Sequence, residues 1–147
     1  MITEFSGKYA FLSNFYAAQC YYDNNRWSTS EHAYQAAKSY KIEEKMEIWN
    51  ARTPDKAKKL GRKVSMRPDW EAVKDQVMYE IVKDKFTDEI LAARLLTTGD
   101  EVLVEGNYWH DNYWGSCTCD KCRVLPKRNQ LGKTLMRVRE ELRKDGK

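Results

Sequence analysis

The stretch WSTSEHAYQAAK, residues 27–38, carries the clearest helix signal in the chain. Ser28 stands three residues before Glu31, which is the capping-box pattern of a helix N-terminus, and no glycine or proline interrupts the residues that follow. The stretch therefore predicts a helix that ends near Lys38. Positions i, i+4 and i+7 share one helix face, so Glu31, Gln35 and Lys38 are expected to point the same way.

Elements on both sides of this helix predict an α+β fold. Before it, Asp23-Asn24-Asn25 separates two short aromatic runs and predicts a tight β-hairpin. Residues 101–105, Glu-Val-Leu-Val-Glu, predict a strand, and residues 106–128 a long loop of the kind that is often functional. Apolar spacing and the glycine and proline positions predict helices over 43–49, over 53–61, from Pro68 through Val82, from Thr87 or Asp88 to Gly99, and from Asn129 onward. We thus expect one helix-rich α+β domain with a small β-sheet over residues 1–147.

The composition is that of a globular protein. Of the 147 residues, 41% are hydrophobic and 33% are charged, and no run approaches the roughly 18 apolar residues of a membrane-spanning helix. The N-terminal stretch has no apolar signal core, so we expect a cytoplasmic protein without a membrane partner.

Positive charge is concentrated at the C-terminal end. Residues 117–147 hold ten basic and four acidic residues, a net charge of +6, whereas the preceding residues hold 16 basic and 18 acidic, a net charge of −2. Such a segment suits a phosphate-bearing ligand or a nucleic acid. The alternative is a solvated helix face. Aromatic residues make up 12% of the chain, and those beside polar residues could line a cleft and stack on a base.

Two carboxylates follow the predicted strand and are candidates for acid–base chemistry. Glu105 ends the strand and Asp111 comes soon after, and carboxylates at the end of a buried strand tend to face a cleft. The structural alternatives are a turn cap for Glu105 and an Asx turn for Asp111. In the helix at 31–38, the structural alternatives are a capping role for Glu31 and a surface position for Lys38.

Three of the four cysteines form a C-x-C-x2-C run at Cys117, Cys119 and Cys122. These thiolates could bind structural zinc if Cys20 or His110 supplied a fourth ligand. The spacing is not that of a standard zinc knuckle, so we expect a loop of reduced thiols and no cofactor, with zinc as the alternative.

An ordered series of motifs resembles the NADAR domain family. The series runs through residues 5–7, 11–15, 27–38, 61–62, 67–70, 85–86, 98–100, 103–105, 111–115 and 129–139. It covers nearly the whole chain in order. The chain departs from the family pattern at residues 116–122, where many members have a short glycine-rich turn.

The resemblance implies an N-glycosidase that cuts bonds between ribose C1 and nitrogen. Members of this family act on phosphorylated ribosylamino-pyrimidine and pyrimidinedione intermediates of riboflavin synthesis, or remove ADP-ribose from guanine in nucleic acid. The implied partner is therefore a phosphorylated, ribose-containing small molecule or ADP-ribosylated nucleic acid. The alternatives are a nucleic-acid-binding module and a non-catalytic binder of NAD or ADP-ribose.

The resemblance also implies roles for individual residues. Lys38 is the expected nucleophile and forms a Schiff base, while Glu31 and Glu105 are the expected acids and Asp111 steadies positive charge or orients water. Arg62 and Arg67 are expected to hold phosphate, Trp70 and Trp114 to stack on the base, and Ser13 and Asn14 to bind ribose or a base edge. Phe15, Gly115 and Asn129 complete the expected substrate site.

Overall fold

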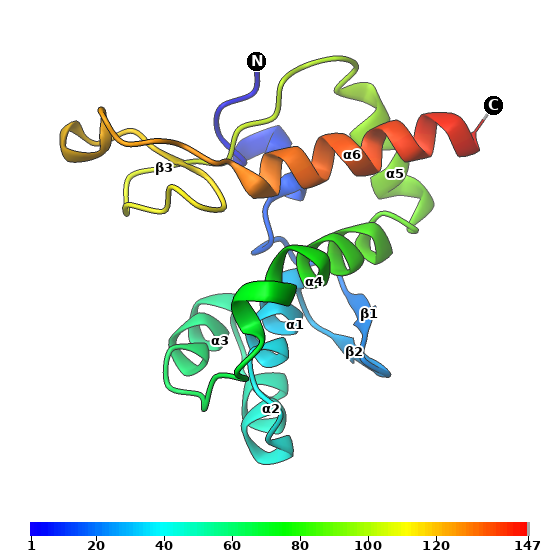
Figure 1. The fold of residues 1–147 in the computed structure, drawn as a ribbon. Helices are drawn as coiled ribbons and strands as arrows, with labels where there is room; N and C mark the ends of the chain where they lie inside the picture. The colour runs from blue at the N-terminus through cyan, green and yellow to red at the C-terminus, as the bar shows by residue number, and fades with distance from the viewer. Residues whose placement is uncertain (147) are drawn as a thin grey trace. The chain divides into compact units, whose positions relative to one another are not determined.

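The structure is a computed structural model, and it describes residues 1–146 of the chain. The chain forms two compact units. The first, here the terminal unit, combines Met1–Ser13 with the segment from Phe86 onward, and the second, the helical unit, is Asn14–Lys85. Helices dominate and the strands are short, as predicted for an α+β fold (Figure 1). None of the helices in residues 1–146 is both long and apolar enough to cross a membrane.

The helical unit begins with the predicted hairpin. Strand β1 (Cys20–Tyr22) pairs antiparallel with β2 (Asn25–Trp27), Tyr22 opposite Asn25. Asp23 and Asn24 form the turn between the strands with φ values of 53° and 62°. Two consecutive positive φ values are what the tight I′ hairpin turn requires, and Asn and Asp tolerate them better than most residues.

Four helices complete the helical unit. They are α1 (Ser30–Ala37), α2 (Ile42–Trp49), α3 (Pro54–Gly61) and α4 (Trp70–Lys85). All eight residues of α1 are buried, because this helix packs against α2, α3, α4 and both strands (Figure 1). The helix predicted at 31–38 is therefore the centre of its unit, and every side chain on it meets another element.

The terminal unit contains the remaining elements. They are the 3-10 helix η1 (Gly7–Leu12), α5 (Glu89–Thr97), β3 (Gly106–Asn107), β4 (Ser116–Cys117), the 3-10 helix η2 (Asp120–Cys122) and α6 (Gln130–Asp145). Helices α5 and α6 pack together, and their inward residues include Leu95, Leu131, Leu135 and Val138, all buried. Strands β3 and β4 pair in parallel.

The strand predicted over 101–105 is wrong. Only Leu103 forms a β-bridge there, to Ile2. The Val102 carbonyl and the Val104 N–H form this bridge with Ile2, each at 2.8 Å. The pairing ends there, since Glu105 N donates to the side chain of Asn129 at 3.0 Å. A short apolar run predicts a buried, extended segment correctly, but it cannot specify what its backbone groups pair with.

Two helix starts also differ from the prediction. The residue that caps α1 is Thr29, whose side chain accepts a hydrogen bond from His32 N, and not Ser28. Helix α4 begins at Trp70, two residues after the expected Pro68. Both shifts are small because Ser and Thr can each cap a helix, and proline occupies or precedes the first turn.

Candidate functional site

The four predicted catalytic residues fall into two groups, one in each unit. Glu31 and Lys38 belong to the helical unit, and Glu105 and Asp111 belong to the terminal unit. A cavity of about 600 Å³ in the terminal unit is lined by residues of the first nine positions together with Thr97, Thr98 and Glu101. It contains none of the predicted site residues.

Glu31 is a buried carboxylate held by its neighbour on α1. Its residue is 7% exposed, and Gln35 Nε2 donates to Glu31 Oε2 at 2.6 Å. The i, i+4 spacing on a helix places these two side chains in contact. Gly61 at the end of α3 leaves the space that Gln35 occupies, because a Cβ there would lie 2.7 Å from Gln35 Cδ. The sequence predicts Gln35 on this face but gives it no role in the site, and it indicates Gly61 as a helix end without its contact with Gln35.

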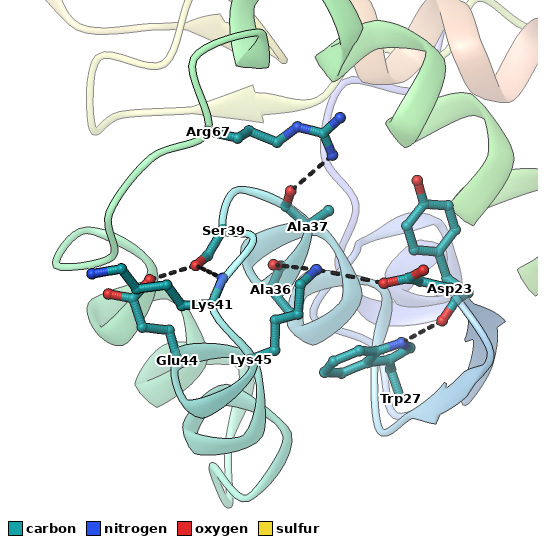
Figure 2. A network of polar contacts seen from close by, with 10 residues as sticks. Asp23, Trp27, Ala36, Ala37, Ser39, Lys41, Glu44, Lys45 and Arg67 are labelled. Carbon is teal, nitrogen blue, oxygen red and sulfur yellow. Dashed lines mark hydrogen bonds and ion pairs between the residues drawn. The ribbon is translucent and has the colours of Figure 1, made fainter.

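Lys38 directly follows α1, and its backbone is fixed by long-range hydrogen bonds. Arg67 N donates to the Lys38 carbonyl at 2.7 Å. The preceding carbonyls also have partners, since Lys45 Nζ donates to Ala36 O at 3.3 Å and an Arg67 guanidinium nitrogen to Ala37 O at 3.4 Å (Figure 2). Orphan carbonyls at a helix C-terminus need such partners. The Lys38 side chain therefore starts from a defined position.

The environment of Lys38 favours its neutral form. Burial lowers the pKa of its amine; the Glu31 carboxylate opposes this shift, and the positive charges of Arg62, Lys58 and Lys74 reinforce it. The ammonium nitrogen lies 5.4 Å from the centre of the Tyr34 ring. Only an unprotonated amine is nucleophilic, so the lowered pKa increases the reactive fraction at neutral pH.

The aromatic residues of the helical unit differ in how much ring surface they present. Trp70 is 3% exposed, and its ring centre lies 5.3 Å from that of Tyr34. Such burial leaves little surface for a base, and the stacking role of Trp70 stays a prediction. Phe15 is exposed, with Lys58 Nζ 5.9 Å from its ring centre. Asn14 is buried and donates to Met78 Sδ at 3.4 Å.

The two predicted phosphate-binding arginines are in different situations. Arg67 already forms a two-pronged pair with Asp69, at 2.6 Å from Nε to Oδ1 and 2.9 Å from NH2 to Oδ2. Its hydrogen bonds lower the pKa of Asp69 to about 2. Arg62 is exposed and makes no ion pair within residues 1–146. Of the two, Arg62 is the one with its guanidinium donors available to a phosphate.

His32, beside Glu31 on α1, has a structural role. Its Nε2 lies 2.9 Å from the carbonyl of Ala51, so this nitrogen carries the proton. Its Nδ1 is hydrogen-bonded to the Thr29 hydroxyl at 2.8 Å. With both ring nitrogens bonded, His32 ties α1 to the segment after α2 and is not available as a base.

In the terminal unit, Asn107 links the two predicted carboxylate residues. Its Nδ2 lies 3.2 Å from Glu105 Oε2 and 2.8 Å from the Asp111 carbonyl. The Asp111 carboxylate accepts from Tyr113 N at 3.1 Å and Trp114 N at 2.9 Å. Asp111 thus forms the turn that was its structural alternative, and its catalytic role stays a prediction.

Asn129 and Gly115 hold the backbone around Glu105. Asn129 has a φ of 48°, and its side chain bridges Glu105 N and the Leu103 carbonyl at 3.0 and 2.8 Å. A Cβ at Gly115 would overlap Glu105. Trp114 packs edge-on against Tyr113, with ring centres 4.9 Å apart. Ser13 directly follows η1 in this same unit. Their contacts with substrate stay predictions.

The cysteine run lies close to His110. The metal-binding atoms of His110, Cys117, Cys119 and Cys122 all lie within 4.8 Å of one another, so this cluster could hold a metal ion. Cys20 is elsewhere, in the helical unit, where burial raises the pKa of its thiol to about 12. Of the two fourth ligands that the sequence left open, the structure therefore supplies His110.

Comparison with known proteins gives a family and a fold. The NADAR domain model matches residues 3–143. An N-glycosidase of Nostoc punctiforme is 42% identical over 141 residues, covering 92% of this chain and 86% of that protein. N-glycosidase YbiA of Escherichia coli is 38% identical, covering 93% of this chain and 84% of YbiA. The NMR structure of E. coli YbiA superposes with a TM-score of 0.84 at 35% identity, covering 99% of this chain and 87% of that one.

A longer relative carries a different name. A riboflavin biosynthesis protein of Vibrio vulnificus is 36% identical over 137 residues, which cover 91% of this chain and 36% of that protein. The matching part of that protein is thus a segment of a larger chain.

Proposed function

Because the chain belongs to the NADAR domain family and is an enzyme of the N-glycosidase class, we propose that it hydrolyses a ribose C1–nitrogen bond in a phosphorylated riboside or an ADP-ribosyl conjugate. The observation that carries this proposal is the half-buried Lys38, whose pKa is lowered beside the buried carboxylate of Glu31. We also propose that residues 1–147 form one domain, since a single family model runs through both units. The cytoplasmic location stays a prediction.

In the proposed reaction, Lys38 attacks the anomeric carbon. The Nζ–C1 bond forms as the C1–N bond to the base breaks, and the departing base takes up a proton. Opening of the ribose ring, with protonation of the ring oxygen, leaves an imine between Nζ and C1. Water then hydrolyses the imine, which releases the sugar and regenerates the amine. The net reaction consumes one water and needs no cofactor.

Proton transfer is assigned to carboxylates. Glu31 is proposed as the acid or base nearest the amine in the helical unit, because its charge already acts on Lys38 and Gln35 orients it. Glu105 and Asp111 are proposed as further proton-transfer or charge-stabilising groups, and for these two the support is the family resemblance alone.

The positive charges around Lys38 favour a phosphorylated substrate. Lys58, Arg62 and Lys74 all act on the amine, and a phosphate among them would be attracted by the same charges. The name of the Vibrio relative supports a riboflavin intermediate as substrate. ADP-ribosylated guanine in nucleic acid is the second substrate class to be screened.

The decisive experiment traps the intermediate. With substrate and borohydride, the imine is expected to be reduced to a stable adduct, located on Lys38 by peptide mass spectrometry. Lys38→Ala should lose base release while keeping its fold. The matched control is Lys41→Ala, which removes an exposed lysine three residues further on. This variant should keep base release. Full turnover by folded Lys38→Ala contradicts the covalent role. Ligand binding without turnover by the wild-type protein favours a non-catalytic module.

The pH profile offers an independent test of the same amine. The value of kcat/KM is expected to rise with pH as Lys38 loses its proton. Lys58→Met removes a charge that lowers the Lys38 pKa, so this rise should move to higher pH. Glu31→Gln removes a charge that raises that pKa, so the residual activity should rise at lower pH. Unchanged pH profiles in both variants would show that deprotonation of Lys38 does not control kcat/KM.

A further inference from the structure

The loop between β3 and α6, yellow to orange in Figure 1, brings one imidazole and three thiols together. His110 Nδ1 lies 3.3 Å from Cys119 Sγ, 3.4 Å from Cys122 Sγ and 3.8 Å from Cys117 Sγ. The three cysteines are free thiols. The four side chains come from three short segments of the terminal unit, before β4, within and just after β4, and in η2.

These distances match the edges of a tetrahedral zinc site. Zinc binds sulfur at about 2.3 Å and imidazole nitrogen at about 2.0–2.1 Å, so tetrahedral angles place nitrogen and sulfur ligands about 3.5 to 3.6 Å apart. The observed nitrogen–sulfur distances, 3.3 to 3.8 Å, lie on both sides of this value. A tetrahedral site also needs its sulfur atoms about 3.8 Å apart, and the four atoms lie within 4.8 Å of one another. One ion could therefore bind all four atoms once the sulfurs close by up to about 1 Å.

Backbone hydrogen bonds hold the three cysteines of the cluster in place. Cys119 N points at Cys117 Sγ, 3.5 Å away, and such N–H groups stabilise a metal-bound thiolate. Cys117 N donates to Asn112 Oδ1 at 2.8 Å. The turn of η2 is closed by Cys122 N donating to the Cys119 carbonyl at 3.2 Å, which sets these two thiols on the same side.

The ligand set also specifies the metal and its role. Three thiolates and one imidazole suit a borderline-soft ion with tetrahedral preference, as zinc is. Four protein ligands leave no open position for water or substrate, which is the mark of a structural site. Zinc with three thiolates carries one negative charge, and the same loop holds Lys121, Arg123 and Lys127. Lys127 Nζ donates to the Cys122 carbonyl.

We propose that His110, Cys117, Cys119 and Cys122 bind one structural Zn²⁺ that fixes the loop between β3 and α6. His110 directly precedes Asp111, and Asn112 binds both Cys117 N and, through its carbonyl, Arg128 N at 2.8 Å. The ion thus anchors the turn that Asp111 forms. The metal site stands independently of the proposed glycosidase reaction.

The test is the zinc content and affinity of the chain of residues 1–147. Protein purified under reducing conditions without chelator is expected to contain about one zinc per chain by elemental mass spectrometry. Replacement by Co²⁺ should give the absorption bands of tetrahedral thiolate coordination. Cys119→Ser should weaken zinc binding at least tenfold in competition with a chromophoric chelator. Cys20→Ser, a cysteine outside the cluster, should keep full zinc content.

Other measurements separate this proposal from its rivals. A chelator strong enough to remove the ion should lower the melting temperature of the wild-type protein, and added Zn²⁺ should restore it. If Cys119→Ser does not fold, His110→Asn and the wild-type titration serve the same purpose. Reduced, folded wild-type protein that neither contains nor takes up zinc overturns the proposal. So does iron at the site, or a disulfide among these cysteines. Loss of zinc with wild-type kinetics would leave the metal site standing and disconnect it from catalysis.

Discussion

Replacing Lys85 with methionine is expected to change how the stability of the protein depends on pH. Lys85 at the end of α4 is 2% exposed, and its ammonium nitrogen lies 5.8 Å from the Tyr16 ring centre. Burial lowers its pKa from 10.5 to about 7, and Cys20 opposes this shift. Methionine has a similar unbranched shape but no proton to bind.

The magnitude follows from proton linkage. Between pH 7 and the unfolded pKa of about 10.4, the unfolded chain keeps the Lys85 proton and the folded protein has released it, so the free energy of unfolding rises with pH. Each pH unit inside this window contributes up to about 1.4 kcal/mol. Near pH 7 the folded side chain is still partly protonated, so we expect the wild-type protein to gain about 2 kcal/mol relative to Lys85→Met between pH 7 and pH 9.

The assay is urea unfolding of both proteins at several pH values from 6 to 9.5. The difference between the two proteins isolates this one group, because all other titrations are shared. Lys83→Met removes an exposed lysine from the same helix, whose Nζ donates to Tyr79, and should run parallel to wild type. Parallel curves for wild type and Lys85→Met would refute the reasoning.

Three further predictions concern the site. Gly61→Ala should displace Gln35 and lower kcat/KM at least about tenfold, because the charge-assisted hydrogen bond from Gln35 to Glu31 is worth about 1.5–3 kcal/mol. Adding Gln35→Ala should restore the melting temperature but not the rate. Wild-type kinetics in the single variant would contradict the contact between Gly61 and Gln35. Asn129→Gly should lower the free energy of unfolding by about 2 kcal/mol through two lost hydrogen bonds. Asn129→Ala should cost about 1 kcal/mol more because of the positive φ, and equal losses in urea unfolding would argue against that strain. Arg62→Met should raise KM for a phosphorylated substrate about tenfold or more and leave KM for the dephosphorylated form nearly unchanged. Arg67→Met breaks the pair with Asp69, so it should change KM for both forms alike. The reverse pattern would assign the phosphate to Arg67.

Local sequence signals were sufficient for the central part of the helical unit. The hairpin turn at Asp23 and Asn24 and the Pro54–Gly61 helix formed as predicted, and the first helix formed with its cap one residue later, at Thr29. Each depends on residues within one or two turns of chain, such as a capping side chain or a proline in the first helical turn. The same local periodicity placed Glu31, Gln35 and Lys38 on one face, and it also places Gln35 within reach of Glu31.

Features that depend on distant residues were decided only by tertiary structure. The run 101–105 reads as a strand, yet its backbone bonds to Ile2 and to the Asn129 side chain. Trp70 and Arg67 look alike as candidate ligand contacts, but packing buries one and Asp69 pairs with the other.

The cysteine run shows most clearly the difference between what the sequence determines and what the tertiary structure decides. Its spacing alone fits reduced thiols or zinc, and the sequence leaves open whether Cys20 or His110 is the fourth ligand. The fold places His110 against the three sulfurs and Cys20 in the other unit. Sequence determines which ligands a chain has, because that is composition and spacing. Which of them meet is decided by packing, because a metal site needs atoms a few ångströms apart in space, whatever their separation along the chain.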